Sequence, residues 1–293
     1  MDSTKLNHLV SRAEDLLSRL ESILPPAPAS IDWSAPAFRW EPRRSGGFLR
    51  AIPRPHRIRL SELHNIERQK TLLDRNTRQF LAGLPANNAL LWGSRGTGKS
   101  SLVKALLTEY SERGLRVIEV DKQHLVELPV IIDLLEKRPE RFILFCDDLS
   151  FEADDPSYKT LKAILDGSLS AAPDNVLIYA TSNRRHLLPE YMADNEQTRI
   201  YEGEIHHGEA VEEKISLSER FGLWVSFYPF DQDAYLDIVF GWLERLGVET
   251  QQAGAEIRAE ALRFALARGS RSGRVAWQFA RDWAGRTALT GAE

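Results

Sequence analysis

The chain is short of the residues and segments that mark secreted and membrane proteins. It has one cysteine, Cys146, in 293 residues, so it forms no disulfide within the chain. The apolar residues that precede Cys146 predict a buried, reduced thiol. No apolar run approaches the length of a transmembrane helix, and the first residues lack the apolar core of a signal peptide. These absences favour a cytoplasmic protein that has no membrane contact.

A strong excess of charge of one sign is lacking too. Charged residues make up 27% of the chain and hydrophobic residues 43%, and the net charge is −4, as in an ordinary globular protein. So small a charge gives no overall attraction to nucleic acid or to an anionic membrane. The length is enough for one large domain or two of ordinary size.

One glycine-rich stretch organises the rest of the sequence. Residues 93–100 read GSRGTGKS, after an apolar run over 89–92 and before an apolar helical pattern. A strand, a glycine loop and a helix in this order indicate a phosphate-binding loop. Its N–H groups would hold phosphates, Lys99 would reach the β- and γ-phosphates, and the Ser100 hydroxyl suits Mg²⁺. The predicted nucleotide-binding residues here are Gly93, Ser94, Arg95, Gly96, Thr97, Gly98, Lys99, Ser100 and Ser101.

Two segments precede this loop and its flanking elements. Residues 4–24 have apolar side chains at helical spacing, which predicts a helix that either binds a partner or docks on its own domain. Residues 25–60 contain seven prolines and little periodicity, which predicts a linker or an extended arm. Seven arginines and one acid lie within residues 39–59, with aromatic residues among them. Such side chains suit either nucleic acid or an acidic face of this chain or of a neighbouring subunit.

Apolar strands and helices alternate through the centre of the chain. Residues 141–148 form an apolar run that ends in Asp147 and Asp148, and a second run over 175–183 ends in Asn183. These runs suit a parallel sheet covered on both faces, in which the carboxyl ends of the strands line the ligand crevice. An acid at such an end suits Mg²⁺, so Asp147 is a predicted metal ligand. Asp148 would then polarise the attacking water.

The remainder predicts a loop, a last strand and a helical domain. Residues 184–218 are rich in acids and poor in apolar residues, which predicts a solvated loop before a short helix. A last buried strand follows over 223–227, and the pattern is helical from residue 231 onward. Arg274 opens the third helical segment, where taken alone it would be a solvated surface arginine. The predicted domains are an N-terminal helix and arm (1–60), a nucleotide-binding α/β domain (61–230) and a helical lid (231–293).

The order of these motifs resembles that of the AAA+ ATPases. In their terms, residues 93–100 are similar to Walker A and residues 142–148 to Walker B. Asn183 resembles sensor 1, Arg220 in the box Ser-Glu-Arg-Phe resembles the arginine finger, and Arg274 resembles sensor 2. At a finer level the chain resembles a bacterial family of ATP-binding proteins catalogued as domain of unknown function number eight hundred and fifteen. The segments that carry this finer resemblance are residues 90–93, 145–151, 180–189, 218–230 and 273–277.

The resemblance implies a fold and a reaction. The fold would be a P-loop NTPase parallel sheet sandwiched by helices, with a small all-helical lid after it and the N-terminal helical or extended arm before it. The cofactors would be ATP or ADP and Mg²⁺, and the β–γ bond of ATP would be hydrolysed. Asn183 would help Asp148 to orient water, and Arg274 would sense the γ-phosphate in the same subunit. Arg220 would act on the neighbour's nucleotide, which implies a homo-oligomer when ATP is bound.

One departure from the AAA+ pattern affects the expected rate. AAA+ ATPases usually end Walker B in Asp-Glu, whereas this chain has Asp147-Asp148. Because aspartate is one methylene shorter than glutamate, turnover is expected to be slow, and Glu152 is a second candidate for activating water.

Two functions from different classes follow from the motifs. The first is an ATPase that remodels or regulates a protein partner, docked through residues 4–24. The alternative is a nucleic-acid-associated loader or initiator-like ATP switch that uses the arginines of residues 39–59, because the Ser-x-Arg-Phe box resembles that of replication initiators. A small-molecule kinase is disfavoured, because it has no use for Arg220 or for a lid that carries Arg274.

Overall fold

The computed structural model describes most of the chain. The described residues are 12, 31–43, 46–151, 155–167, 173–185, 187, 199–201, 204–206, 217–251 and 253–290. The helix predicted over 4–24 lies outside them except at position 12, and Glu152 lies outside them as well, so both stay predictions.

A seven-stranded sheet in the order β2-β1-β4-β5-β6-β3-β9 forms the centre of the fold. Within this sheet every neighbouring pair is parallel except β1 and β2. The mainly parallel sheet predicted from the alternating apolar runs is confirmed. The strands are β1 (Ala37–Arg43), β2 (Gly46–Ile52), β3 (Ala89–Gly93), β4 (Leu115–Glu119), β5 (Arg141–Cys146), β6 (Val176–Ser182) and β9 (Leu223–Phe227).

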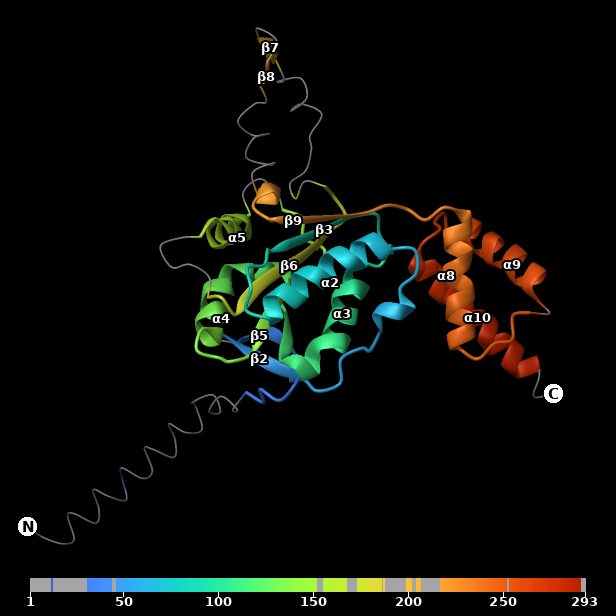
Figure 1. Cartoon of the computed structure of the whole chain (residues 1–293), viewed down its shortest axis with the longest axis horizontal. Coiled ribbons are helices and arrows are strands. Elements are labelled where there is room, and N and C mark those ends of the chain that lie inside the picture. The colour runs from blue at the N-terminus through green and yellow to red at the C-terminus, as the bar shows by residue number, and fades with distance from the viewer. Residues whose placement is uncertain are drawn as a thin grey trace, which may run out of the picture.

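Helices cover both faces of this sheet, and Figure 1 shows α2 and α3 lying in front of it. The alternation of side chains along β5 supplies both cores, because Ile143 and Phe145 face α2 and α3 while Phe142 and Leu144 face α4 and α5. Strands buried on two sides have to be apolar throughout, which explains the continuous runs in the sequence. The helices are α2 (Glu67–Leu81), α3 (Lys99–Tyr110), α4 (Leu128–Leu135) and α5 (Pro156–Asp166), with 3₁₀ turns η1 (Leu60–Glu62), η2 (Ser111–Arg113) and η3 (Lys122–Glu127).

The segment predicted as an extended arm is in part a hairpin of the sheet. β1 pairs antiparallel with β2 and parallel with β4, so residues 37–52 extend the sheet at the β4 edge. Phe38 and Trp40 point inward and are 0% and 1% exposed, while Arg39 between them and Glu41 after them point outward. The prediction of a linker or arm is therefore wrong for these residues, because a period-two pattern outweighs their proline content.

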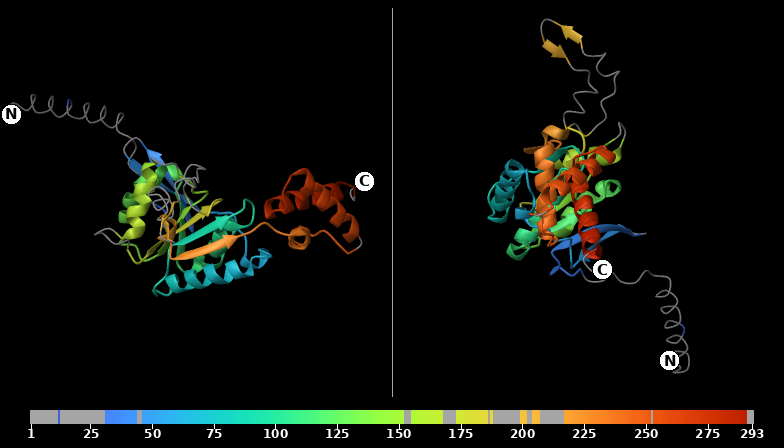
Figure 2. Two further views of the ribbon diagram at one scale, coloured as in Figure 1. Left: turned by 90° about the horizontal axis from the view of Figure 1, so that it is seen from above. Right: turned by 90° about the vertical axis from the view of Figure 1, so that its right-hand side faces the viewer.

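The C-terminal helices form a cluster with its own core. They are α8 (Gln232–Arg245), α9 (Gly254–Ala267) and α10 (Gly273–Thr290), packed around residues such as Tyr235, Ile257 and Phe279. Figure 2 shows them standing beside the sheet, as the predicted lid requires. Two contacts join the lid to the segment before α2: Arg245 pairs with Glu62 at 2.8 Å, and Asn65 Nδ2 donates to the Ala234 carbonyl at 3.1 Å.

The acidic region that the sequence predicts to be a loop contains a small hairpin. β7 (Arg199–Tyr201) pairs antiparallel with β8 (Glu204–His206), and the chain resumes with a short helical turn from residue 217. Across the part of the chain that the structure describes, we find no helix with the length and apolarity needed to span a membrane.

Candidate nucleotide-binding site

The glycine loop lies between β3 and α3, at the carboxyl edge of the sheet. Gly93 has a φ of 131°, and a Cβ there would lie 1.9 Å from the carbonyl oxygen of Phe227 on β9, so only glycine fits. Gly98, with a φ of 99°, directly precedes the first turn of α3. The loop therefore leads into a helix N-terminus, which is the arrangement that binds anions.

Lys99 is buried inside this loop. It is 6% exposed, and its Nζ donates to the carbonyls of Gly93 at 2.7 Å and Ser94 at 2.8 Å and to Asn183 Oδ1 at 3.2 Å. Burial lowers the pKa of Lys99, and Asp147 and Asp148 oppose that effect. A phosphate bound in the loop would favour the charged ammonium further.

A hydroxyl and a carboxylate meet where the sequence predicts the metal ligands. Ser100 Oγ donates to Asp147 Oδ1 at 2.7 Å. Both are hard oxygen donors, and Mg²⁺ is commonly held by one or two carboxylates together with substrate phosphates. The described residues contain no group of three or more His, Cys, Asp or Glu that could hold a metal by themselves. The donor set therefore fits a Mg²⁺ ion that binds together with nucleotide.

Asp148 stands in an unusual backbone conformation next to Asn183. Its φ of 54° is in the left-handed region, which aspartate tolerates better than most residues. Asn183 Nδ2 donates to Asp148 Oδ1, while the amide oxygen of Asn183 accepts from Lys99. Arg95 Nη2 lies 3.9 Å from Asp148 Oδ2. Asn183 thus links the predicted water-orienting acid to the phosphate-binding lysine.

Thr181 holds both acids in place, and it was missed in the sequence. Its Oγ1 donates to Asp147 Oδ1 and accepts from the Asp148 N–H at 2.9 Å, and the residue is 1% exposed. The next residue also binds this loop, since Ser182 Oγ donates to the Leu149 carbonyl at 2.8 Å. The sequence signal for this role was the pair of hydroxyl residues at the end of an apolar strand, because buried hydroxyls need hydrogen-bond partners.

The lid contacts the phosphate loop directly. The N–H of Gly273, at the start of α10, donates to the Gly96 carbonyl at 2.8 Å, and Ser272 lies against Gly96. Arg274 follows Gly273, and its Cβ lies 3.4 Å from the position that a Cβ on Gly96 would take. The predicted sensor arginine of the lid is therefore placed at the same centre as Lys99, Ser100, Asp147, Asp148 and Asn183.

Arg220 is placed away from this centre. Arg220 lies just before β9, and the first residue of β9, Leu223, pairs with Ala89 at the start of β3. The phosphate loop begins at the opposite end of these two strands, where Gly93 pairs with Phe227. At roughly 3.3 Å per residue, the two ends of β9 are about 13 Å apart. Arg220 instead pairs with Asp166 at the end of α5. Its side chain therefore cannot reach the phosphate loop of its own chain.

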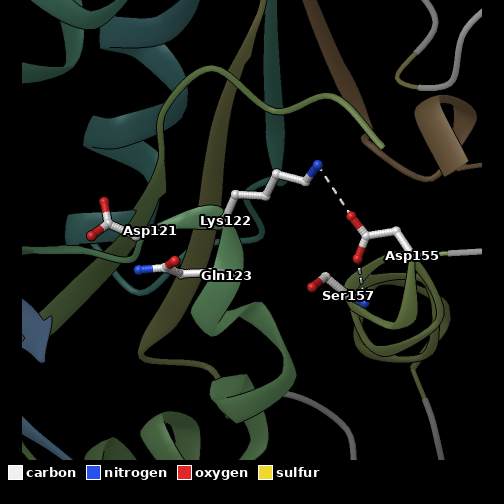
Figure 3. A pocket seen from close by; sticks show the side chains of 5 residues that line it. All are labelled: Asp121, Lys122, Gln123, Asp155 and Ser157. Carbon is white, nitrogen blue, oxygen red and sulfur yellow. Dashed lines mark hydrogen bonds and ion pairs between the residues drawn. The ribbon is translucent and has the colours of Figure 1, made fainter. Parts of the chain in front are cut away.

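A pocket of about 570 Å³ lies between the start of η3 and the start of α5, and it is lined by Asp121, Lys122, Gln123, Asp155 and Ser157. Figure 3 shows Lys122 reaching across it to Asp155, with 3.1 Å between Nζ and Oδ2. Asp155 also caps α5 by accepting the Ser157 N–H at 2.9 Å. The start of α5 is thus fixed to the turn that follows β4, next to the strand that carries the acids.

Three of the arginines of residues 39–59 are engaged within the chain. Arg39 pairs with Glu119 at 2.7 Å, Arg50 pairs with Glu41, and Arg43 stacks on the Phe48 ring at 3.7 Å. The sequence left two kinds of partner open for these arginines, nucleic acid or acidic residues of a protein surface. The contacts of Arg39 and Arg50 are with acidic residues of the same chain. They do not test whether the other arginines bind nucleic acid.

Comparison with known proteins identifies one family and one fold. The family described as Protein of unknown function (DUF815) matches residues 33–287. A point mutant of RuvB from Thermotoga maritima superposes with a TM-score of 0.51 at 18% identity, over 78% of this chain and 65% of that protein. The Aeropyrum pernix ORC1 protein in complex with DNA gives 0.53 at 17% identity, over 78% of this chain and 61% of that protein. This chain thus spans less than two thirds of either protein, and the likeness shows the fold alone. No curated protein matches the chain.

Proposed function

Since the chain belongs to the DUF815 family and has the fold of the AAA+ ATPases, we propose that it binds ATP with Mg²⁺ and hydrolyses the β–γ bond. One observation carries this proposal: Asn183 accepts from the buried ammonium of Lys99 and donates to the carboxylate of Asp148. A phosphate-binding cation and a water-orienting acid are thereby joined by one amide. If residues 93–100 formed only a structural turn, this link between Lys99 and Asp148 through Asn183 would have no purpose.

Each residue of the centre then has a role. The N–H groups of the loop and Lys99 bind the β- and γ-phosphates, and Ser100 and Asp147 hold Mg²⁺. When bound, Mg²⁺ neutralises the charge on the phosphate oxygens. Asp148 accepts a proton from the attacking water or orients that water, and Asn183 fixes the carboxylate.

The lid contributes to the same site. Arg274 lies at the loop because Gly273 is hydrogen-bonded to Gly96, so a γ-phosphate would meet an arginine from the lid. ATP and ADP would therefore favour different lid positions. That difference is the basis on which we propose that the chain regulates or remodels a protein partner.

The site is completed by a second subunit in this proposal. Arg220 cannot reach the loop of its own chain, as the register of β9 shows. An arginine that acts on the neighbour's nucleotide requires a homo-oligomer when ATP is bound, and such fingers are worth about a thousandfold or more in rate.

The nucleotide site is tested by binding and turnover. Wild-type protein is expected to bind ATP in a Mg²⁺-dependent way, and Lys99→Ala is expected to lose binding while keeping its thermal unfolding temperature within a few degrees. Tight binding by Lys99→Ala would refute the assignment of the loop. Asp148→Asn set against Glu152→Gln identifies the acid that activates water, because only one of the two should stop hydrolysis without weakening binding.

The alternative function, a nucleic-acid-associated ATP switch, is supported by fewer residues than the sequence suggested. ORC1 was solved in complex with DNA, but a likeness at 17% identity speaks for the fold alone. With Arg39 and Arg50 paired to acids and Arg43 stacked on Phe48, the other exposed arginines among the described residues of this segment are Arg54, Arg57 and Arg59. A steep salt dependence of DNA binding that disappears when these three are changed to Ala would favour this alternative.

A further inference from the structure

The outward face of η3 and α4 is apolar although it is exposed. Val126, Val130 and Leu134 follow one another at intervals of four residues, so they form one stripe along this face. Their exposed fractions are 43%, 53% and 43%. Single exposed hydrophobic residues are common, whereas three in a row on one helix are typical of a surface that another element covers. The opposite face of α4 is already packed in the core.

The first described residues of the chain lie beside the carboxyl end of α4. Trp33 packs against the same core cluster as α4, and so does Ile31. The guanidinium of Arg138, three residues after the end of α4, lies over the Trp33 ring at 4.5 Å. In Figure 1 this blue start of the coloured ribbon lies below α4. The residues that precede position 31 are therefore tethered next to the apolar stripe.

These preceding residues include a segment with a matching apolar stripe. The helix that the sequence predicts over residues 4–24 would carry nine apolar side chains along one side. They are Leu6, Leu9, Val10, Ala13, Leu16, Leu17, Leu20, Ile23 and Leu24. A helix with such a side has to bury it against another apolar surface. The stripe on α4 is a surface of that kind.

The charges beside the two stripes are complementary. Lys5, Arg12 and Arg19 recur every seven residues, which would place them along one flank of the predicted helix. On α4 the exposed acids Asp133 and Glu136 lie close to the stripe in sequence. A basic flank next to these acids would favour one orientation of the docked segment.

The connection is short enough to keep the segment near α4. Residues 25–30 span at most about 20 Å when fully extended. A helix over residues 4–24 would be about 30 Å long, and the stripe from Val126 to Leu134 is about 12 Å long. The segment is therefore long enough to cover the stripe. A short tether also gives an effective concentration on the order of millimolar, which favours the chain's own segment over a free partner.

We propose that residues 4–24 dock on the stripe of Val126, Val130 and Leu134 in the same chain. The sequence left open whether this segment binds a partner or docks on its own domain, and the point at which it joins the described chain favours its own domain. A protein partner that binds residues 4–24 then has to compete with α4. The inference does not depend on the proposed function, because no part of it involves nucleotide.

The reactivity of a cysteine placed in the stripe tests this proposal in the full-length chain. Cys146 is buried and its pKa is raised to about 12, so Val130→Cys provides one reactive thiol. The rate of its alkylation by a maleimide is measured without nucleotide and divided by the rate in denaturant. Leu266→Cys gives the rate at an uncovered position, because Leu266 on α9 is 82% exposed. Leu134→Cys repeats the measurement at a second position of the stripe.

The thiol in the stripe is expected to be protected. Val130→Cys should react at least about tenfold more slowly than Leu266→Cys, since a segment docked for about nine-tenths of the time leaves the thiol open only for the remainder. The protection should be independent of protein concentration, because the segment and the stripe belong to one chain.

Two changes in the segment show whether it provides the cover. Leu16→Asp together with Leu20→Asp should restore fast alkylation, because carboxylates are not buried against an apolar stripe without partners. Ser11→Asp together with Ser18→Asp is the matched control. It adds the same charge to the opposite side of the predicted helix and should leave the protection intact.

Three results would overturn the inference. Fast alkylation of Val130→Cys in the otherwise unchanged chain shows that the stripe is open. Slow alkylation that persists with Leu16→Asp and Leu20→Asp shows that another surface covers it. Protection that disappears on dilution, together with a smaller particle in gel filtration, shows that a second copy of the chain covers it. An unchanged rate for Leu266→Cys in both aspartate backgrounds, together with thermal unfolding, confirms that the variants remain folded.

Discussion

Replacing Thr181 by valine tests how the two acids of the site are held. The change keeps the shape of the side chain and removes the hydroxyl, which donates to Asp147 and accepts from the Asp148 N–H at 2.9 Å. An unsatisfied donor costs about 1–3 kcal/mol, and a hydrogen bond to a charged group contributes a similar amount. Both acids are exposed on their outer side, where water can replace part of the loss. We therefore expect Thr181→Val to lower the free energy of unfolding by about 1–3 kcal/mol.

The effect on catalysis should exceed the effect on binding. The hydroxyl helps to hold Asp148 at a φ of 54°, and without it the backbone can relax and move the carboxylate away from Asn183. General-base groups contribute roughly a hundredfold or more, so a partial loss of position should reduce single-turnover hydrolysis at least about tenfold. ATP affinity should fall less, because Lys99 and the loop are untouched.

Thr181→Ser is the matched control for this experiment. It keeps the hydroxyl and removes a buried methyl group, so it should retain most of the hydrolysis while losing some stability. Single-turnover rates, ATP titrations and chemical unfolding would be measured for both variants. Equal hydrolysis by Thr181→Val and wild type, or equal losses in the valine and serine variants, would refute this explanation of the site.

Three further predictions concern the loop, the lid and the thiol. Burial lowers the pKa of Lys99 in the free protein, and a bound phosphate would raise that pKa, so ATP binding should be accompanied by proton uptake. The affinity for ATP should therefore fall as the pH rises through the lowered pKa of Lys99. Calorimetry that shows a constant affinity across the alkaline range would contradict this prediction. Gly96→Ala should weaken ATP binding, because a Cβ at position 96 would lie 2.9 Å from Ser272 of the lid. Gly114→Ala is the control, since Gly114 has a similar left-handed backbone but open space around it. It should lower the free energy of unfolding by about 1 kcal/mol and leave ATP affinity unchanged. Cys146, whose pKa burial raises to about 12, should react with thiol reagents only on unfolding, and rapid labelling of native protein would disprove this.

The sequence was sufficient for the fold, and for which strand ends would bring the candidate site residues together, because those signals are local. The buried strands appear as continuous apolar runs, since helices cover both faces of the sheet. The loop of residues 93–100 and the acids at the end of β5 stand at strand ends, where a parallel sheet brings them to one edge. Cys146 was expected to be buried and is so.

The β1–β2 hairpin was misread because Pro42 within it and the prolines on either side of it were given too much weight. Phe38 and Trp40 alternate with Arg39 and Glu41, and a Gly-Gly pair precedes the second apolar run, which together are the signature of a hairpin. Proline is tolerated near the edge of a sheet, where fewer backbone N–H groups take part in the hydrogen bonds between strands.

Contacts between distant residues were beyond reach from one sequence. The pairing of Arg220 with Asp166 depends on where α5 ends relative to β9, and no periodicity in the chain specifies that distance. Thr181 looked like an ordinary strand residue, because its role depends on a loop more than thirty positions away. Glu152 lies outside the described residues, so its part stays a prediction.

The most direct test of a shared active site is the dependence of turnover on protein concentration. ATP hydrolysis per subunit would be measured for wild type and Arg220→Ala over a range that spans assembly, with ATP saturating throughout. Wild-type turnover per subunit should rise with concentration and then level off, while Arg220→Ala should bind ATP normally and stay at a low, constant rate. Turnover per subunit that is independent of concentration in the wild type, or unchanged in Arg220→Ala, would contradict the account.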